Sequence, residues 1–402
     1  MKIHRPLPWL GGITASEFMR RHWQRKPLFV KGAFPQWRSA PPPVTESRLL
    51  QLFDEGALPS RLLLPDGRLL HGPLPASRLP KPSRRNWTIL VQQINTADRA
   101  ADELLNAFRF IPEARLDDLM ISLASEGGGI GAHVDSYDVF LIQAQGIRQW
   151  EIARAFDPTL NPSASMRVLQ HFEAEQSWAC EPGDLLYLPP GVAHRGTALT
   201  PGCMTYSVGF RTVDPLQVAD EAFAQRADVE SSTSSAAAPD PWLKATSRPG
   251  EIPEALMESL LTQAQAQLPT RSDLQRALLI KLSEPHPEVF WELPRPISLT
   301  TFRKRLTSGQ RLALRPGARL LVWKHQAAAN GELLSLEALG KTARTRARQH
   351  LVQLANGREL NPDCCVAISE HETIAQIFLS LFLDGIIEFR RRSAPKRPID
   401  AL

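Results

Sequence analysis

Between residues 116 and 211, short apolar runs follow one another and are separated by glycine, proline and aspartate. Apolar runs of this length, bounded by such residues, are typical of β-strands joined by tight turns. Many short strands in succession can hide their edges by forming two facing sheets. The pattern therefore predicts a double-stranded β-helix, or jelly roll, over this stretch.

Outside that stretch, several segments have apolar residues at helical spacing. We expect helices at residues 13–22, 46–55, 98–108, 213–226, 253–267 and 272–283. We expect strands at residues 28–31 and 86–95, and a hairpin around Asp66-Gly67. Strand-rich and helical segments that are largely separate indicate the α+β class.

The C-terminal part of the chain indicates a smaller module. Residues 297–306 have a helical pattern, and residues 311–324 resemble a strand pair around Pro316-Gly317. Two helices are expected to follow, with a terminal strand within residues 385–392. Helices combined with a short hairpin favour a winged-helix-like domain.

These patterns divide the chain into three parts. Residues 1–212 hold the jelly roll with flanking helices and strands, residues 213–290 are helical, and residues 291–402 form the winged-helix-like domain. A segment rich in Ser, Ala and Pro at residues 228–250 is typical of a mobile loop or linker. Helices that lack partners of their own often complete their core across a two-fold axis, so we expect a homodimer.

Composition excludes only a few classes of protein. The 402 residues carry a formal net charge of +5, which is too small to indicate a nucleic-acid-binding surface. The four cysteines show no C-x-x-C spacing and are typical of reduced thiols. The N-terminus has no apolar signal core, and no run approaches about eighteen apolar residues. We therefore expect a cytoplasmic protein that contacts no membrane.

His133 and Asp135 form an H-x-D triplet among β-forming residues. Residues two apart on a strand point to the same face, so the imidazole and the carboxylate would project together. If His194 comes from a neighbouring strand, the set becomes two histidines and one carboxylate. That set binds Fe(II) on one face and leaves positions open for a cosubstrate and O₂.

An H-x-D triplet alone is common on protein surfaces. Here a glycine run, residues 127–131, precedes the triplet, and a turn, an apolar strand and a second turn lead to His194. Arg148 follows the next expected strand and a turn at Gly146. A buried arginine at this place could bind the distal carboxylate of 2-oxoglutarate with two parallel hydrogen bonds.

Asp118, Met120 and Ser122 share one face of the strand expected at residues 116–123. If that face is the inner one, Asp118 needs a cation, and a substrate guanidinium would suit it. A surface aspartate on an edge strand is an equally good interpretation of this position. Thr205 and Ser207 line a similar face of the strand after His194.

Several motifs resemble the JmjC-type ribosomal oxygenases, in particular the bacterial branch that hydroxylates an arginine of large-subunit ribosomal protein uL16. Besides the glycine-rich H-x-D segment, these are H-W-Q-R-K-P-L at 22–28, N-W-T-I-L-V-Q-Q-I-N at 86–95, L-D-D-L-M-I-S at 116–122, E-P-G-D-L-L-Y-L-P-P-G-V-A-H at 181–194 and Y-S-V-G-F at 206–210. The resemblance is dense over residues 15–215 and looser towards the C-terminus.

The resemblance implies hydroxylation of an arginine β-carbon with Fe(II), 2-oxoglutarate and O₂. It places the metal on His133, Asp135 and His194, and the cosubstrate on Arg148 with Ser122 and Thr205. It makes Asp118, Met120 and Tyr137 arginine contacts, with Ser207 as a further candidate. It also implies a dimer formed by the middle helices. It does not imply that the C-terminal domain recognises a DNA sequence.

Two alternatives remain open. Within enzymes, the same site could serve a histidyl or lysyl hydroxylase or a demethylase. Asp118 cannot separate arginine from lysine, whereas a histidyl hydroxylase would need a different side-chain pocket. A catalytically silent jelly roll that binds a ribosomal protein would not need the triad and Arg148 together. Ile147 and Arg195 depart from residues that occur in relatives, which could alter peptide recognition outside the metal site.

Overall fold

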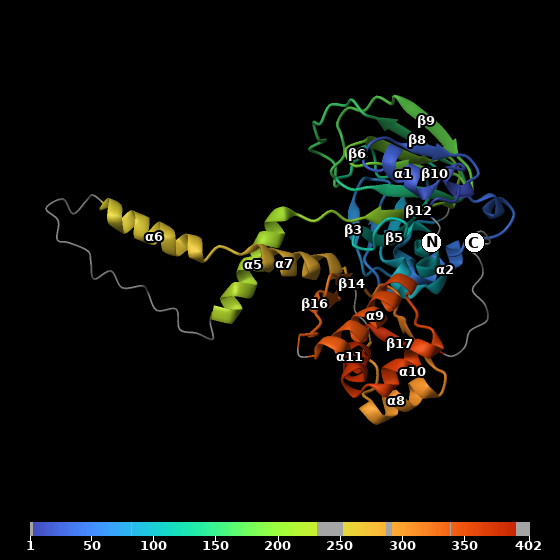
Figure 1. Ribbon diagram of the computed structural model, residues 1–402. Helices are drawn as coiled ribbons and strands as arrows, with labels where there is room; N and C mark the ends of the chain where they lie inside the picture. The colour runs from blue at the N-terminus through green and yellow to red at the C-terminus, as the bar shows by residue number, and fades with distance from the viewer. Residues whose placement is uncertain (1–2, 82, 231–251, 287–291, 338, 391–402) are drawn as a thin grey trace.

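The computed structural model describes residues 3–81, 83–230, 252–286, 292–337 and 339–390. The strands of the jelly roll lie at one end of the molecule, and the helices of the C-terminal part lie at the other (Figure 1). Helices α5 (Pro215–Glu230), α6 (Glu254–Ala266) and α7 (Arg271–Ser283) project sideways from between these two bodies (Figure 1). The expected α+β class and jelly roll are confirmed.

The larger sheet has eight strands in the order β1-β10-β7-β12-β5-β4-β2-β3, and all neighbours are antiparallel. Its strands are β1 (Leu28–Val30), β2 (Ser60–Leu63), β3 (Leu69–His71), β4 (Thr88–Val91), β5 (Leu116–Ala124), β7 (Val139–Gln145), β10 (Leu185–Leu188) and β12 (Cys203–Phe210). The smaller sheet has the order β6-β11-β8-β9, with β6 (His133–Val134), β8 (Arg148–Ala153), β9 (Gln176–Cys180) and β11 (Ala193–Ala198).

Side-chain alternation along the larger sheet separates a helix-covered core from the site. On β12, Met204, Tyr206 and Val208 are buried in the main core, whereas Thr205 and Ser207 point the other way, into a cavity. Strand β5 repeats this pattern, with Ile121 in the core. The two-residue period thus turns one face of the sheet towards the helices and the other towards the smaller sheet.

Short helices cover the core face. They are α1 (Ala15–Arg21), α2 (Glu46–Glu55), α3 (Ile94–Ala97) and α4 (Arg99–Leu105), with 3₁₀ turns η1 (Pro8–Leu10), η2 (Pro35–Arg38), η3 (Ala76–Arg78) and η4 (Asn106–Phe108). The hydroxyls of Thr14 and Thr45 accept from backbone N–H groups in the first turns of α1 and α2, which explains where these helices begin. The helix expected at 46–55 is confirmed at both ends.

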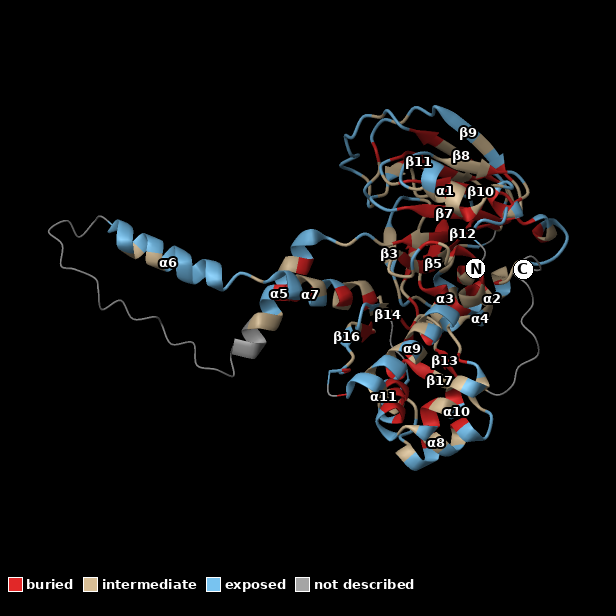
Figure 2. Cartoon of the chain, viewed as in Figure 1, coloured by how far each residue is buried: buried red, intermediate tan, exposed pale blue. Residues whose placement is uncertain are grey.

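The middle of the chain forms an arm from α5 (Pro215–Glu230), α6 (Glu254–Ala266) and α7 (Arg271–Ser283). Helices α5 and α7 pack through Val218, Ala222 and Ala277. No residue of helix α6 is buried, and most are exposed (Figure 2). The loop expected at 228–250 begins within the last turn of α5, and its remainder lies outside the described residues.

The C-terminal part contains α8 (Leu299–Thr307), α9 (Lys341–Gly357), α10 (Pro362–Glu370) and α11 (Glu372–Leu383). Its strands are β13 (Arg311–Leu314), β14 (Leu320–Trp323), β15 (Gln326–Ala329), β16 (Glu332–Leu333) and β17 (Ile387–Arg390). No single helix in the described part of the chain is long and apolar enough to span a membrane, and α10 with α11 meets the length and composition criteria only as a pair bent by 118°.

The strand pair expected at residues 311–324 is wrong as a pair. Both segments are strands, but β13 pairs with β17 and β14 pairs with β15. Strand β14 finds its partner locally, through the tight turn at Lys324 and His325, whereas β13 reaches a strand that is distant in sequence. Three helices, rather than the two expected, separate β16 from the terminal strand β17.

Candidate functional site

The smaller sheet brings the two histidines of the predicted triad together. Strands β6 and β11 are antiparallel neighbours, and His133 lies directly opposite His194, with ring centroids 4.1 Å apart. Strand β6 ends at Val134, so Asp135 is held by the following turn, where its carbonyl accepts from the N–H of Gly191. Its carboxylate lies 3.9 Å from Nε2 of His133 and 3.6 Å from Nε2 of His194.

Both imidazoles are oriented for metal binding. In each ring Nδ1 lies 3.0 Å from a backbone carbonyl, that of Gly131 for His133 and that of Val192 for His194. An Nδ1–H donated to these carbonyls leaves the Nε2 lone pairs directed at Asp135. Burial lowers the pKa of His194 to about 3, so this ring is neutral and able to bind a metal at physiological pH.

These three side chains fit a divalent metal. Their donor atoms all lie within 4.8 Å of one another, and they are the one set with this property among the residues the structure describes. Burial raises the pKa of Asp135, a cost that a bound cation would offset. Of the remaining histidines, His71 and His171 are exposed and belong to no such set.

A cavity of about 430 Å³ opens beside the triad, between the two sheets. All ten candidate site residues line it: Asp118, Met120, Ser122, His133, Asp135, Tyr137, Arg148, His194, Thr205 and Ser207. They come from β5, β6, β8, β11 and β12 and from the turn that follows β6. Strand alternation in both sheets therefore directs these side chains into one space.

Arg148 is the buried cation of this cavity. Its side chain is 3% exposed, and its guanidinium carbon lies 5.8 Å from the ring centroid of Trp150. Nη1 donates to the carbonyl of Gly196 at 3.3 Å, whereas Nε and Nη2 have no hydrogen-bond partner within the described residues. A buried guanidinium with open donors is costly unless a ligand carboxylate occupies them, so the cavity fits a dicarboxylate.

Ser122 and Thr205 lie on paired strands at the cavity wall. The Ser122 hydroxyl donates to the carbonyl of Thr205 at 3.4 Å, a long hydrogen bond that leaves it free to turn towards a ligand. The Thr205 hydroxyl donates to Oε1 of Gln143 at 2.8 Å. Gln143 fixes the orientation of Thr205, a role that its position inside an apolar strand did not reveal.

Asp118 lines the cavity from the same face of β5 as Ser122, four residues nearer the start of the strand. It is 6% exposed and accepts a hydrogen bond from the N–H of Gln93 at 2.9 Å. Burial, with a contribution from the neighbouring Asp117, raises the pKa of Asp118 to about 7. The inward orientation therefore replaces the surface-aspartate interpretation of this position.

Met120 and Ser207 lie beside Asp118 on paired strands, and Tyr137 lies at the cavity mouth with 40% of its side chain exposed. Burial and Asp135 raise the pKa of the Tyr137 hydroxyl, which keeps it a neutral donor. These four residues place one anion, one thioether and two hydroxyls around the same cavity. It suits a long cationic side chain.

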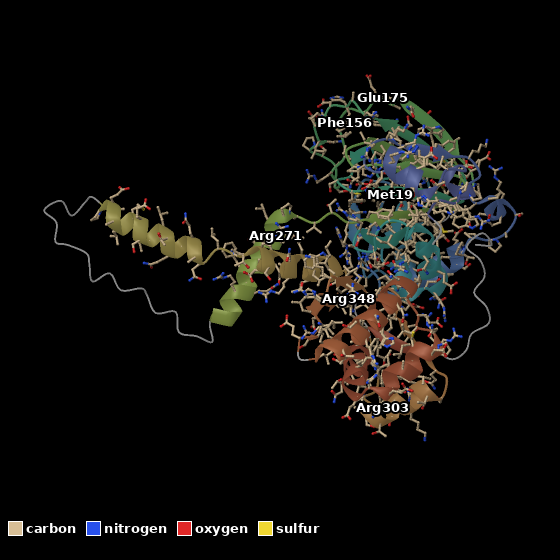
Figure 3. The ribbon with its side chains drawn as sticks, viewed as in Figure 1. Met19, Phe156, Glu175, Arg271, Arg303 and Arg348 are labelled. Carbon is tan, nitrogen blue, oxygen red and sulfur yellow. The ribbon has the colours of Figure 1, made fainter. Side chains whose placement is uncertain are left out.

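The cavity continues into an outer hollow of about 790 Å³. Arg61, Tyr137 and Met166 line both spaces, and Phe156 borders the outer hollow in the segment between β8 and β9 (Figure 3). The sequence did not single out Arg61, because the hairpin that carries it has the pattern of a surface ribbon. Its Nε is buried without a partner among the described residues.

The two positions that depart from the family pattern lie away from the triad donors. Arg195 forms a two-pronged ion pair with Glu151, at 2.7 and 2.9 Å, and lies over the ring of Phe172. The N–H of Ile147 donates to the hydroxyl of Thr200 in the turn before β8. Neither residue lines the cavity.

Comparison with known proteins gives matches at the level of domain, sequence and structure. Residues 103–217 match the model of the JmjC domain. The chain is 38% identical over 199 residues to the ribosomal protein uL16 3-hydroxylase of Escherichia coli (strain K12), covering 48% of this chain and 52% of that protein. It is 34% identical over 203 residues to a probable ribosomal oxygenase of Haemophilus influenzae, covering 50% of each. The matched region spans about half the length of these curated relatives.

The structural matches extend further along the chain. The X-ray structure of E. coli ycfD superposes with a TM-score of 0.80 and 28% identity, covering 94% of this chain and 98% of that one. The structure of YcfD, described as a ribosomal oxygenase, in complex with cobalt and 2-oxoglutarate has a TM-score of 0.77 at 28% identity and the same coverage. The jelly roll, the arm and the C-terminal helices thus have counterparts in one solved protein.

Proposed function

Because residues 103–217 are a JmjC domain and the chain shares its architecture with a bacterial ribosomal oxygenase, we propose that it is an Fe(II)- and 2-oxoglutarate-dependent oxygenase. Its substrate is an arginine of large-subunit ribosomal protein uL16, hydroxylated at the β-carbon. A cytoplasmic location follows from a substrate that is assembled into ribosomes.

One observation carries the proposal: a buried arginine with open donors shares a cavity with a two-histidine, one-carboxylate set. His133, Asp135 and His194 would hold the iron, and Arg148 would bind the distal carboxylate of the cosubstrate, with Ser122 and Thr205 beside it. When bound, iron and 2-oxoglutarate supply the oxidising power that inserts one oxygen atom of O₂ into a C–H bond, as 2-oxoglutarate is converted to succinate and CO₂.

The chain's own residues orient the substrate and exclude water. Asp118 would accept hydrogen bonds from the arginine guanidinium, and the cation would offset the cost of burying this carboxylate. Met120 would pack along the aliphatic part of the side chain, with Tyr137 and Ser207 as donors near its end. Because the guanidinium end is held at Asp118, the carbons nearer the peptide backbone face the triad.

The substrate assignment draws on the relatives as well as the cavity. The E. coli relative is named a uL16 3-hydroxylase, and Asp118 gives this chain the anion that an arginine substrate requires. A lysyl substrate would satisfy the same carboxylate with a single point charge, but a buried carboxylate is better matched by the planar guanidinium fork.

We also propose that the protein forms a homodimer and that the arm forms the interface. Met257, Leu260 and Leu261 on α6 are between 39% and 51% exposed, and none of the residues of α6 is buried. A helix with this much apolar surface is stabilised when a partner covers it. A second copy that brings its own arm would supply such a surface on a two-fold axis.

The function is tested by succinate formation from 2-oxoglutarate, measured with and without uL16. We expect uL16 to stimulate turnover in the wild-type protein, and the His194→Ala variant to form no succinate above background. Stimulation by an unrelated basic protein to the same extent would contradict the substrate. Turnover by the His194→Ala variant would contradict the metal site.

A further inference from the structure

The first half of β5 carries Asp118 but lacks a strand on one side. Strand β5 pairs with β4 only from Ile121 to Ala124. Its pairing with β12 is irregular between Val208 and Phe210, opposite the segment that holds Asp118. The segment from Leu116 to Met120 is therefore the part of the substrate wall that the sheet holds least firmly.

A side chain from the C-terminal part covers this open edge. Nη2 of Arg319 donates to the carbonyl of Leu116 at 2.5 Å and to that of Asp117 at 3.0 Å, and Nη1 donates to the carbonyl of Glu113 at 3.3 Å. Arg319 is 5% exposed. Its own backbone is fixed by two hydrogen bonds with Asn330, which hold it at the start of β14.

Asp117, next to Asp118, is held from the same side. Arg211 donates to its carboxylate at 2.7 and 3.2 Å, and Nη2 of Arg319 lies 3.7 Å from it. Arg211 also donates to the carbonyl of Glu284, just after α7. The C-terminal part and the end of the arm thus meet at the residue that precedes the substrate carboxylate.

We propose that Arg319 is a positioning residue through which the C-terminal part of the chain fixes Asp118 in the substrate cavity. This inference rests on the proposed function in one respect, the contact between Asp118 and a substrate guanidinium. It gives the C-terminal part a role in substrate selection rather than in nucleic-acid recognition.

The physical reason lies in the two strand carbonyls that Arg319 satisfies. Without its guanidinium, the carbonyls of the buried Leu116 and the half-buried Asp117 lose a charged donor, and the strand end must move or admit water to satisfy them. A shift of this kind moves Asp118 directly, since it is the next residue. The two triad histidines and Arg148 lie on the other sheet, and Asp135 lies in the turn after β6, so these residues would keep their geometry.

Other arginines cross the same interface without touching β5, which provides a matched control. Arg358 lies 3.3 Å from the carboxylate of Asp102 and 3.4 Å from that of Glu113. An Arg358→Met variant therefore weakens the docking of the C-terminal part but leaves the β5 carbonyls bound. Arg303, far from the jelly roll (Figure 3), donates to the carbonyl of Ser369 and controls for loss of stability within the C-terminal part.

The first test measures the strand itself and needs no catalysis. Backbone hydrogen exchange is followed by mass spectrometry in the full chain for the wild type and for Arg319→Met, Arg358→Met and Arg303→Met. We expect exchange to rise on the order of tenfold at residues 116–120 in Arg319→Met alone. Equal increases in Arg358→Met, or increases spread over the C-terminal part, would overturn the inference.

The second test measures substrate use. In Arg319→Met, KM for an arginine peptide of uL16 should rise on the order of tenfold, while KM for 2-oxoglutarate stays unchanged. Arg319→Lys, which keeps one charged donor, should recover part of the loss. In an Asp118→Asn background the Arg319→Met change should add almost nothing, because both changes remove the same contact. A full additive loss, or an equal rise in KM for 2-oxoglutarate, would refute the positioning role.

The two tests separate this inference from the proposed function. If the wild-type protein does not hydroxylate the peptide, the proposed function fails, and hydrogen exchange still decides whether Arg319 holds β5. If the peptide is hydroxylated and Arg319→Met matches the wild type in both measurements, the inference fails alone.

Discussion

At the scale of single residues, the site depends on buried charges whose partners are ligands. Within the described residues, Nε and Nη2 of Arg148 are buried without a hydrogen-bond partner, and the buried Asp118 carboxylate accepts one hydrogen bond, from a backbone N–H. Such groups cost stability in the free protein. These unpaired buried groups identify the cavity as a ligand-binding site more clearly than its shape does.

Arg148→Met should raise KM for 2-oxoglutarate on the order of a hundredfold, because truncating one member of a buried charged pair leaves the other unpaired. Arg148→Lys should fall between this variant and the wild type, since a lysine offers a point charge without the fork. Succinate formation at varied 2-oxoglutarate gives both values. An unchanged KM in Arg148→Met would remove this residue from the cosubstrate site.

The raised pKa of Asp118 predicts that kcat/KM for the arginine peptide depends on pH. Burial and Asp117 raise its pKa to about 7, whereas the N–H of Gln93 and the guanidinium groups of Arg319 and Arg211 lower it. The carboxyl is therefore largely protonated below that pH and cannot pair with a guanidinium. We expect kcat/KM for the arginine peptide to rise with pH from about 6 to about 8 and to level off. Asp118→Asn should lower kcat/KM and flatten the profile, and an Asp118→Asn profile that still rises like the wild type would contradict the assignment.

At the scale of elements, periodicity predicted what local sequence determines. The two-residue period predicted which face of β5 and β12 lines the site, and helical spacing predicted α1, α2, α6 and α7 closely. The partners of β13 and β14 could not be predicted, because β13 pairs with a strand some seventy residues away. Arg319 and Gln143 escaped notice for the same reason: their roles exist only once distant segments meet.

The glycine run before β6 packs closely against β11, and this packing gives a testable prediction. A Cβ at Gly129 would lie 2.3 Å from the carbonyl oxygen of Gly196, the acceptor of Arg148. Gly129→Ala should therefore push β11 aside, lower the free energy of unfolding by about 1–3 kcal/mol and weaken 2-oxoglutarate binding. Thermal unfolding and calorimetry measure the two effects.

Gly357→Ala is the matched control, because no atom lies within 4 Å of its Cβ at the end of α9. It should leave the unfolding temperature unchanged or slightly raised. If Gly129→Ala proved as stable as this control and bound 2-oxoglutarate equally well, the close packing of the glycine run against β11 would not matter for the site.

At the scale of the whole molecule, the three parts of the chain differ in their relation to the cavity. The residues that line the cavity all belong to the jelly-roll part, Arg319 of the C-terminal part donates to the strand that carries Asp118, and α6 of the arm has exposed apolar side chains. Glu284, just beyond the arm, accepts from Arg211 beside the substrate end.

The double variant Leu260→Glu, Leu261→Glu should convert the dimer to a monomer, because it places charges in the apolar surface that a partner would cover. Multi-angle light scattering at micromolar concentration measures the mass. Glu258→Gln on the same helix, which removes a charge outside the apolar surface, should remain dimeric. A wild-type monomer, or a double variant that stays dimeric, would contradict assembly through α6.

The most direct measurement is fragment-ion mass analysis of uL16 after incubation with this protein, Fe(II) and 2-oxoglutarate in air. We predict a gain of one oxygen atom on the β-carbon of a single arginine, and no gain with the His133→Ala variant. Oxygen on a different type of residue, or 2-oxoglutarate consumption with uL16 unmodified, would contradict the substrate. Hydroxylation that persists in His133→Ala would contradict the site itself.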